Sequence, residues 1–139
     1  MSYLDEYDSR RPFFERLVRW IGLALLVGVL GYSVYWLFFR NWREEAEVRH
    51  FLEEVQQQKF EAAYKRWGCS VEEPCRYYSY TSFLEDWGPD SPLGKVGSFR
   101  LGRSYTQEGG VIIEVWINDK KQPNLWVDSA TEVISFFPY

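Results

Sequence analysis

The chain has 139 residues, of which 46% are hydrophobic and 19% aromatic, and its formal net charge is −4 at pH 7. This composition excludes a low-complexity disordered chain, because disordered segments are poor in aromatic residues. From Asn41 onward 11 basic residues stand against 16 acidic ones, which argues against nucleic acid as a partner, since phosphate binding needs clustered cationic side chains.

An uncharged apolar segment runs from Trp20 to Phe39 and reads WIGLALLVGVLGYSVYWLFF. Twenty residues of α-helix rise about 30 Å, the hydrocarbon thickness of a bilayer. The segment ends in Tyr-Trp-Leu-Phe-Phe-Arg, whereas a cleaved signal peptide has a shorter apolar region that ends at small residues. The sequence therefore predicts an uncleaved transmembrane helix at 20–39 with the lipid bilayer as its surroundings.

The charges that flank this segment bear on its orientation. The arginines before it are Arg10, Arg11, Arg16 and Arg19, and those that closely follow it are Arg40, Arg43 and Arg49. Because the side richer in Lys and Arg stays in the cytoplasm, this small excess favours a cytoplasmic tail at 1–19. We therefore expect a single-pass protein of the cytoplasmic (inner) membrane whose domain at 40–139 lies in the periplasm or another extracytoplasmic space.

Small residues recur along one face of the predicted transmembrane helix. Ala24, Gly28 and Gly31 are spaced i, i+4 and i+7, so they share a helical face. Such a seam allows close approach of a second helix, and in lipid this packing drives association. Two interpretations stay open: contact with the transmembrane helices of other subunits, or the ordinary abundance of Gly and Ala in membrane helices.

Three helices are predicted in the first half of the following domain. The apolar residues that repeat there at helical spacing are Val48, Phe51, Leu52 and Val55. They indicate a helix at about 44–57, and a second helix follows at 59–67 and ends at Gly68, since glycine commonly terminates helices. The segment TSFLEDWG predicts a third short helix with Thr81 as its cap and Gly88 as its end.

The last third of the chain shows β-rich runs, which are SFRLGRSY, VIIEVWIN, NLWVDS and EVISFF. Gly109-Gly110 and Asn118-Asp119 are typical of hairpin turns, and Ser129-Ala130-Thr131 separates the last two runs. Helices followed by antiparallel strands indicate an α+β fold, with about three helices packed on one face of a curved sheet of about four strands.

The two cysteines, Cys69 and Cys75, lie six positions apart in the stretch GCSVEEPC. Their spacing matches neither a C-x-x-C redox motif nor a metal knuckle, and two cysteines alone cannot form a structural zinc site. A disulfide that closes a small loop is the favoured interpretation, and free thiols are the alternative. A disulfide would agree with an oxidising, extracytoplasmic location.

Candidate residues for catalysis or ligand binding are few. A carboxylate can serve as a general acid or base where an apolar pocket raises its pKa toward neutral. Asp86 beside Trp87 is the candidate for this role, and an ordinary solvated carboxylate is the alternative. The single histidine, His50, is too little for a triad or a His-based metal site. Tyr77, Tyr78 and Tyr80 could line a ligand pocket, belong to a protein interface or pack in the core, and the sequence leaves these three roles open. We expect no catalytic residue, no metal and no cofactor.

The segment FLEEVQQQKFEAAYKRW resembles the opening helices of the cystatin-like, nuclear-transport-factor-2-like superfamily, in which the Ala-Tyr pair, here Ala63-Tyr64, enters the core. The stretches GKVGSFRLGRSY, CRYYSYTSFLEDWGPDSPLGK and LWVDSATEVISFF are similar to small bacterial envelope proteins of that superfamily. The resemblance covers about 44–139 and implies a fold. It implies little about activity, because these motifs are mostly core and turn residues, although the superfamily includes isomerases, dehydratases and cyclases with a cone-shaped pocket.

Two functions follow from these features. The first is a non-catalytic, single-pass accessory subunit that stabilises or caps a larger membrane protein complex, for example a respiratory or photosynthetic electron-transfer complex. The second is a membrane-tethered envelope domain that binds a ligand, or a small lyase- or isomerase-type enzyme, in the pocket of the fold. We favour the first, because the uncharged helix with its seam of small residues is suited to docking on other helices.

Overall fold

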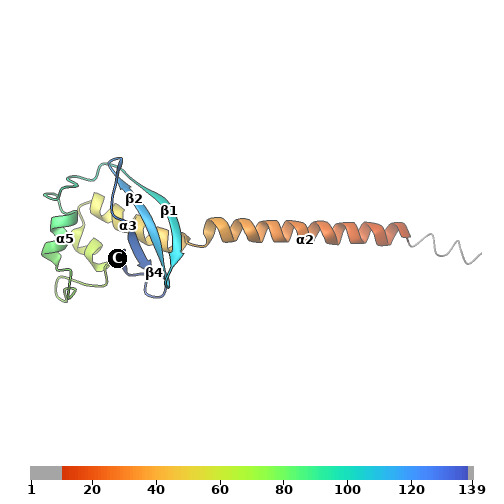
Figure 1. Ribbon diagram of the computed structural model, residues 1–139, viewed down its shortest axis with the longest axis horizontal. Coiled ribbons are helices and arrows are strands. Elements are labelled where there is room, and N and C mark those ends of the chain that lie inside the picture. The colour runs from red at the N-terminus through yellow and green to blue at the C-terminus, as the bar shows by residue number, and fades with distance from the viewer. Residues whose placement is uncertain (1–10, 138–139) are drawn as a thin grey trace, which may run out of the picture. The chain divides into compact units, whose positions relative to one another are not determined.

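The computed structural model describes residues 11–137, so the first ten residues of the predicted tail and the last two of the chain lie outside the described part. The chain divides into two units, with the boundary between Arg40 and Asn41. The first unit contains α2 (Arg11–Phe39), a single uninterrupted helix (Figure 1). It begins before the predicted boundary at Trp20, because Pro12 suits the first turn of a helix and the residues after it continue the helical path.

Apolar side chains of α2 face outward on all sides. Leu25, Val29 and Phe38 are 66%, 63% and 75% exposed, and from Pro12 to Phe39 every residue is exposed. Length and composition alone would allow this helix to cross a membrane, as they would for a signal sequence near an N-terminus. Exposing this much apolar surface to water is unfavourable, so we expect it to be buried against a bilayer or another protein.

Within residues 41–137, three helices match the predicted ones: α3 (Trp42–Gln56), α4 (Phe60–Lys65) and α5 (Tyr80–Trp87). Gly68 has a φ of +80°, which ends the α4 segment as predicted. The predicted cap of α5 is wrong by two positions. Ser79 caps the helix, because its hydroxyl oxygen accepts a hydrogen bond from the Ser82 N–H at 3.2 Å, whereas Thr81 already lies inside the helix.

The strands form one antiparallel sheet. In the described residues they are β1 (Phe99–Gln107), β2 (Gly110–Ile117), β3 (Lys120–Lys121), β4 (Leu125–Asp128) and β5 (Ile134–Phe136), with the order β1-β2-β4-β5 and β3 paired with the end of β2. The additional strand β3 arises because the turn at Asn118 and Asp119, both with positive φ, folds the two lysines back onto β2. Pairing then stops at Pro123, which lacks a backbone donor.

The hairpin between β1 and β2 turns one residue earlier than predicted. Glu108 and Gly109 have φ values of +50° and +80° and form the turn, while Gly110 is the first residue of β2. A side chain at Gly110 would collide with the indole of Trp126. The glycine at 110 is therefore explained by close packing within the sheet rather than by the turn.

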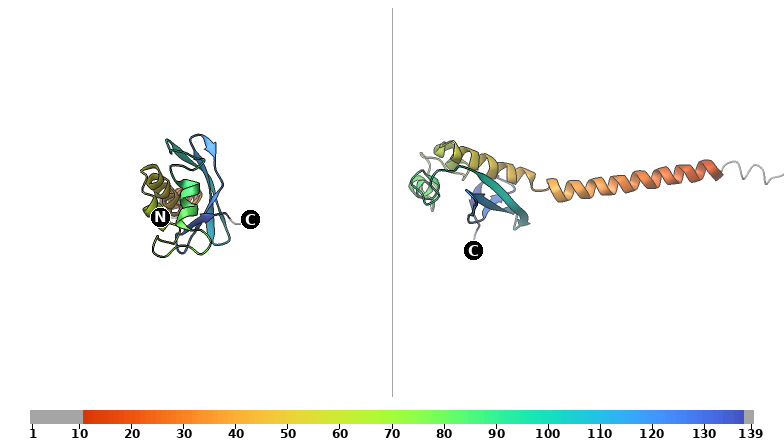
Figure 2. Two further views of the ribbon diagram at one scale, coloured as in Figure 1. Left: turned by 90° about the vertical axis from the view of Figure 1, so that its left-hand side faces the viewer. Right: turned by 90° about the horizontal axis from the view of Figure 1, so that it is seen from above.

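The helices lie on one side of the sheet and leave its other side open (Figure 2). The buried core between them takes its side chains from all three helices and from β2, β4 and β5, namely Val48, Phe51, Leu52, Val55, Ala63, Tyr64, Phe83, Trp87, Val111, Ile113, Val115, Ile117, Leu125, Val127 and Ile134, together with Trp67 and Val96. Alternation along β2 produces this arrangement, because every second residue points toward the helices. The Ala63-Tyr64 pair lies in the core, as expected from its sequence.

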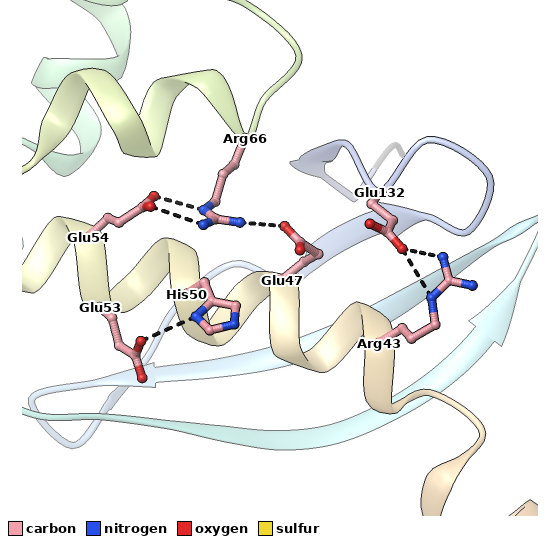
Figure 3. A network of polar contacts seen from close by, with 7 residues as sticks. All are labelled: Arg43, Glu47, His50, Glu53, Glu54, Arg66 and Glu132. Atoms are coloured by element: carbon pink, nitrogen blue, oxygen red, sulfur yellow. Dashed lines mark hydrogen bonds and ion pairs between the residues drawn. The ribbon is translucent and has the colours of Figure 1, made fainter.

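An ion-pair network joins α3 to the end of α4 (Figure 3). The Arg66 guanidinium donates to both carboxylate oxygens of Glu54, at 2.8 and 3.0 Å, and to Glu47 at 2.6 Å. These carboxylates raise the pKa of Arg66, with the hydrogen bonds that Arg66 donates to Glu54 as the largest cause. The carbonyl of Arg66 also accepts from the Ile134 N–H at 2.9 Å, so this residue connects the two helices to β5.

Candidate functional site

The predicted helix-packing seam lies on a regular part of α2. Ala24, Gly28 and Gly31 are all within the uninterrupted helix, so they share one face. Apart from the backbone of α2 itself, no heavy atom among residues 11–137 lies within 4 Å of a Cβ built at Gly28 or at Gly31. The surface over both glycines is therefore free for a neighbouring helix, and occupation of that surface stays a prediction.

The structure pairs Cys69 with Cys75 as a disulfide, and their Cα atoms lie 5.2 Å apart, within the usual range for such a bond. The closed loop is held to the buried Tyr64. The Cys75 N–H donates to the Tyr64 hydroxyl oxygen at 3.1 Å, and that hydroxyl donates to the carbonyl of Tyr78 at 2.7 Å. Tyr64 thus fixes both the disulfide loop and the segment that leads to α5.

Replacing Cys69 and Cys75 together with alanine is expected to lower the free energy of unfolding by about 2 kcal/mol, the loop-closure entropy for a ring of roughly seven residues. Urea unfolding followed by tryptophan fluorescence measures the loss. Reductant should lower the stability of the wild-type protein by a similar amount and leave the double variant unchanged. If both wild-type cysteines react with an alkylating reagent in the folded, unreduced protein, the free-thiol alternative holds instead.

The three tyrosines that are clustered in the sequence, Tyr77, Tyr78 and Tyr80, lie in different surroundings. Tyr77 is 88% exposed. The hydroxyl of Tyr78 donates to the Asp86 carboxylate at 2.8 Å, and burial, followed by this carboxylate, raises the pKa of Tyr78 so that the hydroxyl stays protonated across the physiological range. Tyr80 packs on the ring of Tyr64, with centroids 5.3 Å apart. A single tyrosine-lined site is therefore not formed.

A hollow of about 430 Å³ lies at the side of α5. Asp86 and Trp87 contribute to it from α5, and residues distant in sequence complete it, namely Leu93, Ile117, Lys120 and Phe136. The sequence predicted the first two as pocket residues and missed the others. No local signal marks them, because they meet α5 only through the hairpin at Asn118 and the return of β5 along β4.

Two buried polar groups at the end of α5 and in the loop that follows it have no hydrogen-bond partner among residues 11–137. Trp87 is 4% exposed and its indole N–H has no acceptor among residues 11–137. Ser91, which lies in the adjoining loop and is 7% exposed, has a hydroxyl without a partner in the same part of the chain. Buried donors of this kind are uncommon in native structures, because an unmade hydrogen bond costs about 1–3 kcal/mol.

His50 lies on the exposed side of α3. Its Nδ1 is 3.4 Å from a carboxylate oxygen of Glu53, one turn along the same helix (Figure 3). Within the described range 11–137, no three His, Cys, Asp or Glu side chains gather in a way that could hold a metal ion. His50 is thus positioned as a surface residue of α3.

No protein-family model, no curated protein and no solved structure matches this chain. The α+β class is a property of the structure itself. The resemblance to the cystatin-like, nuclear-transport-factor-2-like superfamily stays a prediction from sequence. Function therefore has to be argued from the residues and their geometry.

Proposed function

We propose that this protein is a single-pass membrane protein whose apolar helix docks on the transmembrane helices of a larger complex, as a non-catalytic accessory subunit. The observation that carries the proposal is the exposed apolar surface of α2, which includes Leu25, Val29 and Phe38. Burying one such side chain is worth about 1.5–3 kcal/mol. A bilayer would cover the apolar side chains along the whole 20–39 segment. Within residues 11–137 no other part of the chain covers them.

The seam of small residues supports docking on other helices. Gly28 and Gly31 leave open space on one face of α2, and close backbone approach in lipid is made by small residues of this type. The partner in this proposal is a transmembrane subunit of a respiratory or photosynthetic electron-transfer complex, or of a comparable assembly. The domain from Asn41 onward then covers or braces that assembly.

We place the tail in the cytoplasm and the domain outside the cytoplasmic membrane. The excess of arginine before Trp20 supports this orientation. The Cys69–Cys75 pairing supports it independently, because disulfides persist in oxidising compartments. Appending a periplasm-dependent reporter such as alkaline phosphatase to the C-terminus tests the orientation directly: activity agrees with it, and inactivity contradicts it.

A non-catalytic role is supported by the state of Asp86, the strongest catalytic candidate in the sequence. Asp86 is exposed at the end of α5, and the Tyr78 hydroxyl already donates to its carboxylate at 2.8 Å. The proton of that hydroxyl is strongly held, since burial raises the pKa of Tyr78. The pair is better suited to holding the 77–87 segment in place than to transferring protons.

Replacing Gly28 with leucine is expected to remove partner subunits that co-purify with the wild-type protein in mild detergent in a fixed ratio. The leucine side chain fills the space through which a second helix would approach. The matched control is Gly22→Leu. Gly22 is also free of neighbours within 4 Å and lies roughly opposite the seam at about 100° per residue.

Quantitative mass spectrometry of the purified complexes measures the ratio. Gly22→Leu should keep the wild-type ratio while Gly28→Leu loses most of it. A wild-type protein that purifies as a monomer under these conditions contradicts the accessory-subunit proposal, and equal ratios for the two variants contradict the assignment of the seam.

A further inference from the structure

The hollow beside α5 combines an apolar floor with charges of both signs from different elements. Leu93, Ile117 and Phe136 supply the floor together with the ring of Trp87. Asp86 stands at the α5 side and Lys120 at the β3 side. These two groups form no ion pair with each other, since none between them lies within 4.0 Å.

The two lysines of β3 have different surroundings. Lys121 also borders the hollow, but it is opposite Trp116 in the sheet and its ammonium donates to Glu114 at 3.3 Å. Lys120 is opposite the buried Ile117, so strand alternation places it on the side of the sheet that faces the helices and the hollow. Among residues 11–137 its ammonium has no hydrogen-bond or ion-pair partner.

We infer that this hollow binds a short peptide of about two or three residues that has free ends and an apolar side chain. Its ammonium would lie at Asp86 and its carboxylate at Lys120, with the side chain against Leu93 and Phe136. The ring of Trp87 would border the same apolar side chain. The volume of about 430 Å³ is that of a small-ligand site.

The charge arrangement decides the class of ligand. A simple anion attracted to Lys120 would also meet the carboxylate of Asp86, and a simple cation attracted to Asp86 would meet the ammonium of Lys120. A ligand with one charge of each sign at opposite ends satisfies both groups. A peptide can also carry the apolar side chain that suits Leu93, Ile117 and Phe136.

The hollow lies at the end of the sheet opposite to the point where the chain enters the domain. Asn41, the first residue of the domain, donates from its side-chain amide to the Ser104 hydroxyl at 3.3 Å and accepts from the Thr106 hydroxyl at 3.2 Å. Thr106 pairs with the beginning of β2, whereas the hollow lies at Ile117. Thr106 is paired with Val111, and the six residue steps from Val111 to Ile117 span about 20 Å. This inference is independent of which complex the apolar helix joins.

The test uses the full chain in detergent micelles with isotope-labelled tryptophan, titrated with the dipeptide Leu-Phe and observed by NMR. The indole N–H signal of Trp87, assigned by its loss in Trp87→Phe, is expected to shift and to saturate as the peptide binds beside the Trp87 ring. N-acetyl-Leu-Phe-amide, which lacks both charges, is expected to bind more weakly. Absence of a saturable shift overturns the inference, as does equal affinity for the blocked peptide.

Substitutions at the two charged groups test the orientation of the peptide. Asp86→Asn and Lys120→Met are each expected to weaken Leu-Phe binding about fivefold, since an exposed charge contact is worth up to about 1 kcal/mol. Glu85→Gln and Lys95→Met are matched controls at exposed residues outside the lining of the hollow, and both should leave the affinity unchanged.

Acetylating only the amino end of the peptide removes the ammonium that Asp86 would contact. Asp86→Asn should then have no further effect, while Lys120→Met should still weaken binding. Equal losses in the test and control variants would show that only the general charge of the surface matters and would overturn the proposed site.

Discussion

Replacing both Leu26 and Val29 with arginine is expected to prevent stable insertion of the protein into the membrane. The two positions lie near the middle of the 20–39 segment, one helical turn apart. Each arginine at the centre of a transmembrane helix costs about 2.5–3.5 kcal/mol on insertion scales, so the pair costs about 5–7 kcal/mol. These values already include the relief that snorkelling and local thinning of the bilayer provide.

Carbonate extraction followed by flotation on a density gradient measures the effect. The wild-type protein should remain with the membranes, and the double arginine variant should shift to the soluble or aggregated fraction. Leu26→Ala with Val29→Ala is the control, since it removes similar side chains but adds no charge. Retention of the arginine variant with the membranes would contradict a bilayer-spanning role for α2.

Replacing Phe51 with alanine is expected to be the most destabilising single substitution in the domain. Phe51 is fully buried, and its ring makes edge contacts with Trp67, Phe83 and Trp87 at centroid distances of 5.9, 6.2 and 4.9 Å. Loss of a buried phenylalanine costs about 3–5 kcal/mol through lost burial and the remaining cavity. A small domain has a total stability of about 5–15 kcal/mol, so a large share of it is lost.

Urea unfolding followed by tryptophan fluorescence measures this loss, since two of the neighbouring rings are indoles. His50→Ala is the matched control. His50 precedes Phe51 in α3 but its side chain is exposed, so a change of within about 0.5 kcal/mol is expected. If both variants unfold at the same urea concentration, Phe51 is not at the centre of the core.

Local sequence signals predicted the elements of this fold well. The spacing of Val48, Phe51 and Val55 indicated α3 because apolar residues on one face of a helix recur with its turn. Asn118-Asp119 indicated a hairpin because both residues tolerate positive φ, as the turn requires. Both signals involve residues close together in the chain, where sequence and conformation are directly linked.

Sequence signals were weaker where two adjacent residues suit the same role. Ser79 and Thr81 are both good caps, and only the extended backbone at Ser79 decides which hydroxyl reaches the first turn of α5. Gly109 and Gly110 both suit a turn, and the packing of Trp126 over Gly110 decides that the second glycine belongs to the strand. In both cases three-dimensional contacts distinguish candidates that look equivalent in sequence.

The candidate sites divide in the same way. The apolar helix with Ala24, Gly28 and Gly31, the α+β class and the pairing of Cys69 with Cys75 could all be read or expected from the sequence, because each depends on spacing along a short segment. The hollow beside α5 could not, because Lys120 and Phe136 reach Asp86 only after the sheet has formed. Sequence by itself thus determined the apolar helix α2 and the helices and strands of the domain. Tertiary packing alone decided which charged and aromatic side chains share a site, because a shared site depends on contacts between residues far apart in the chain.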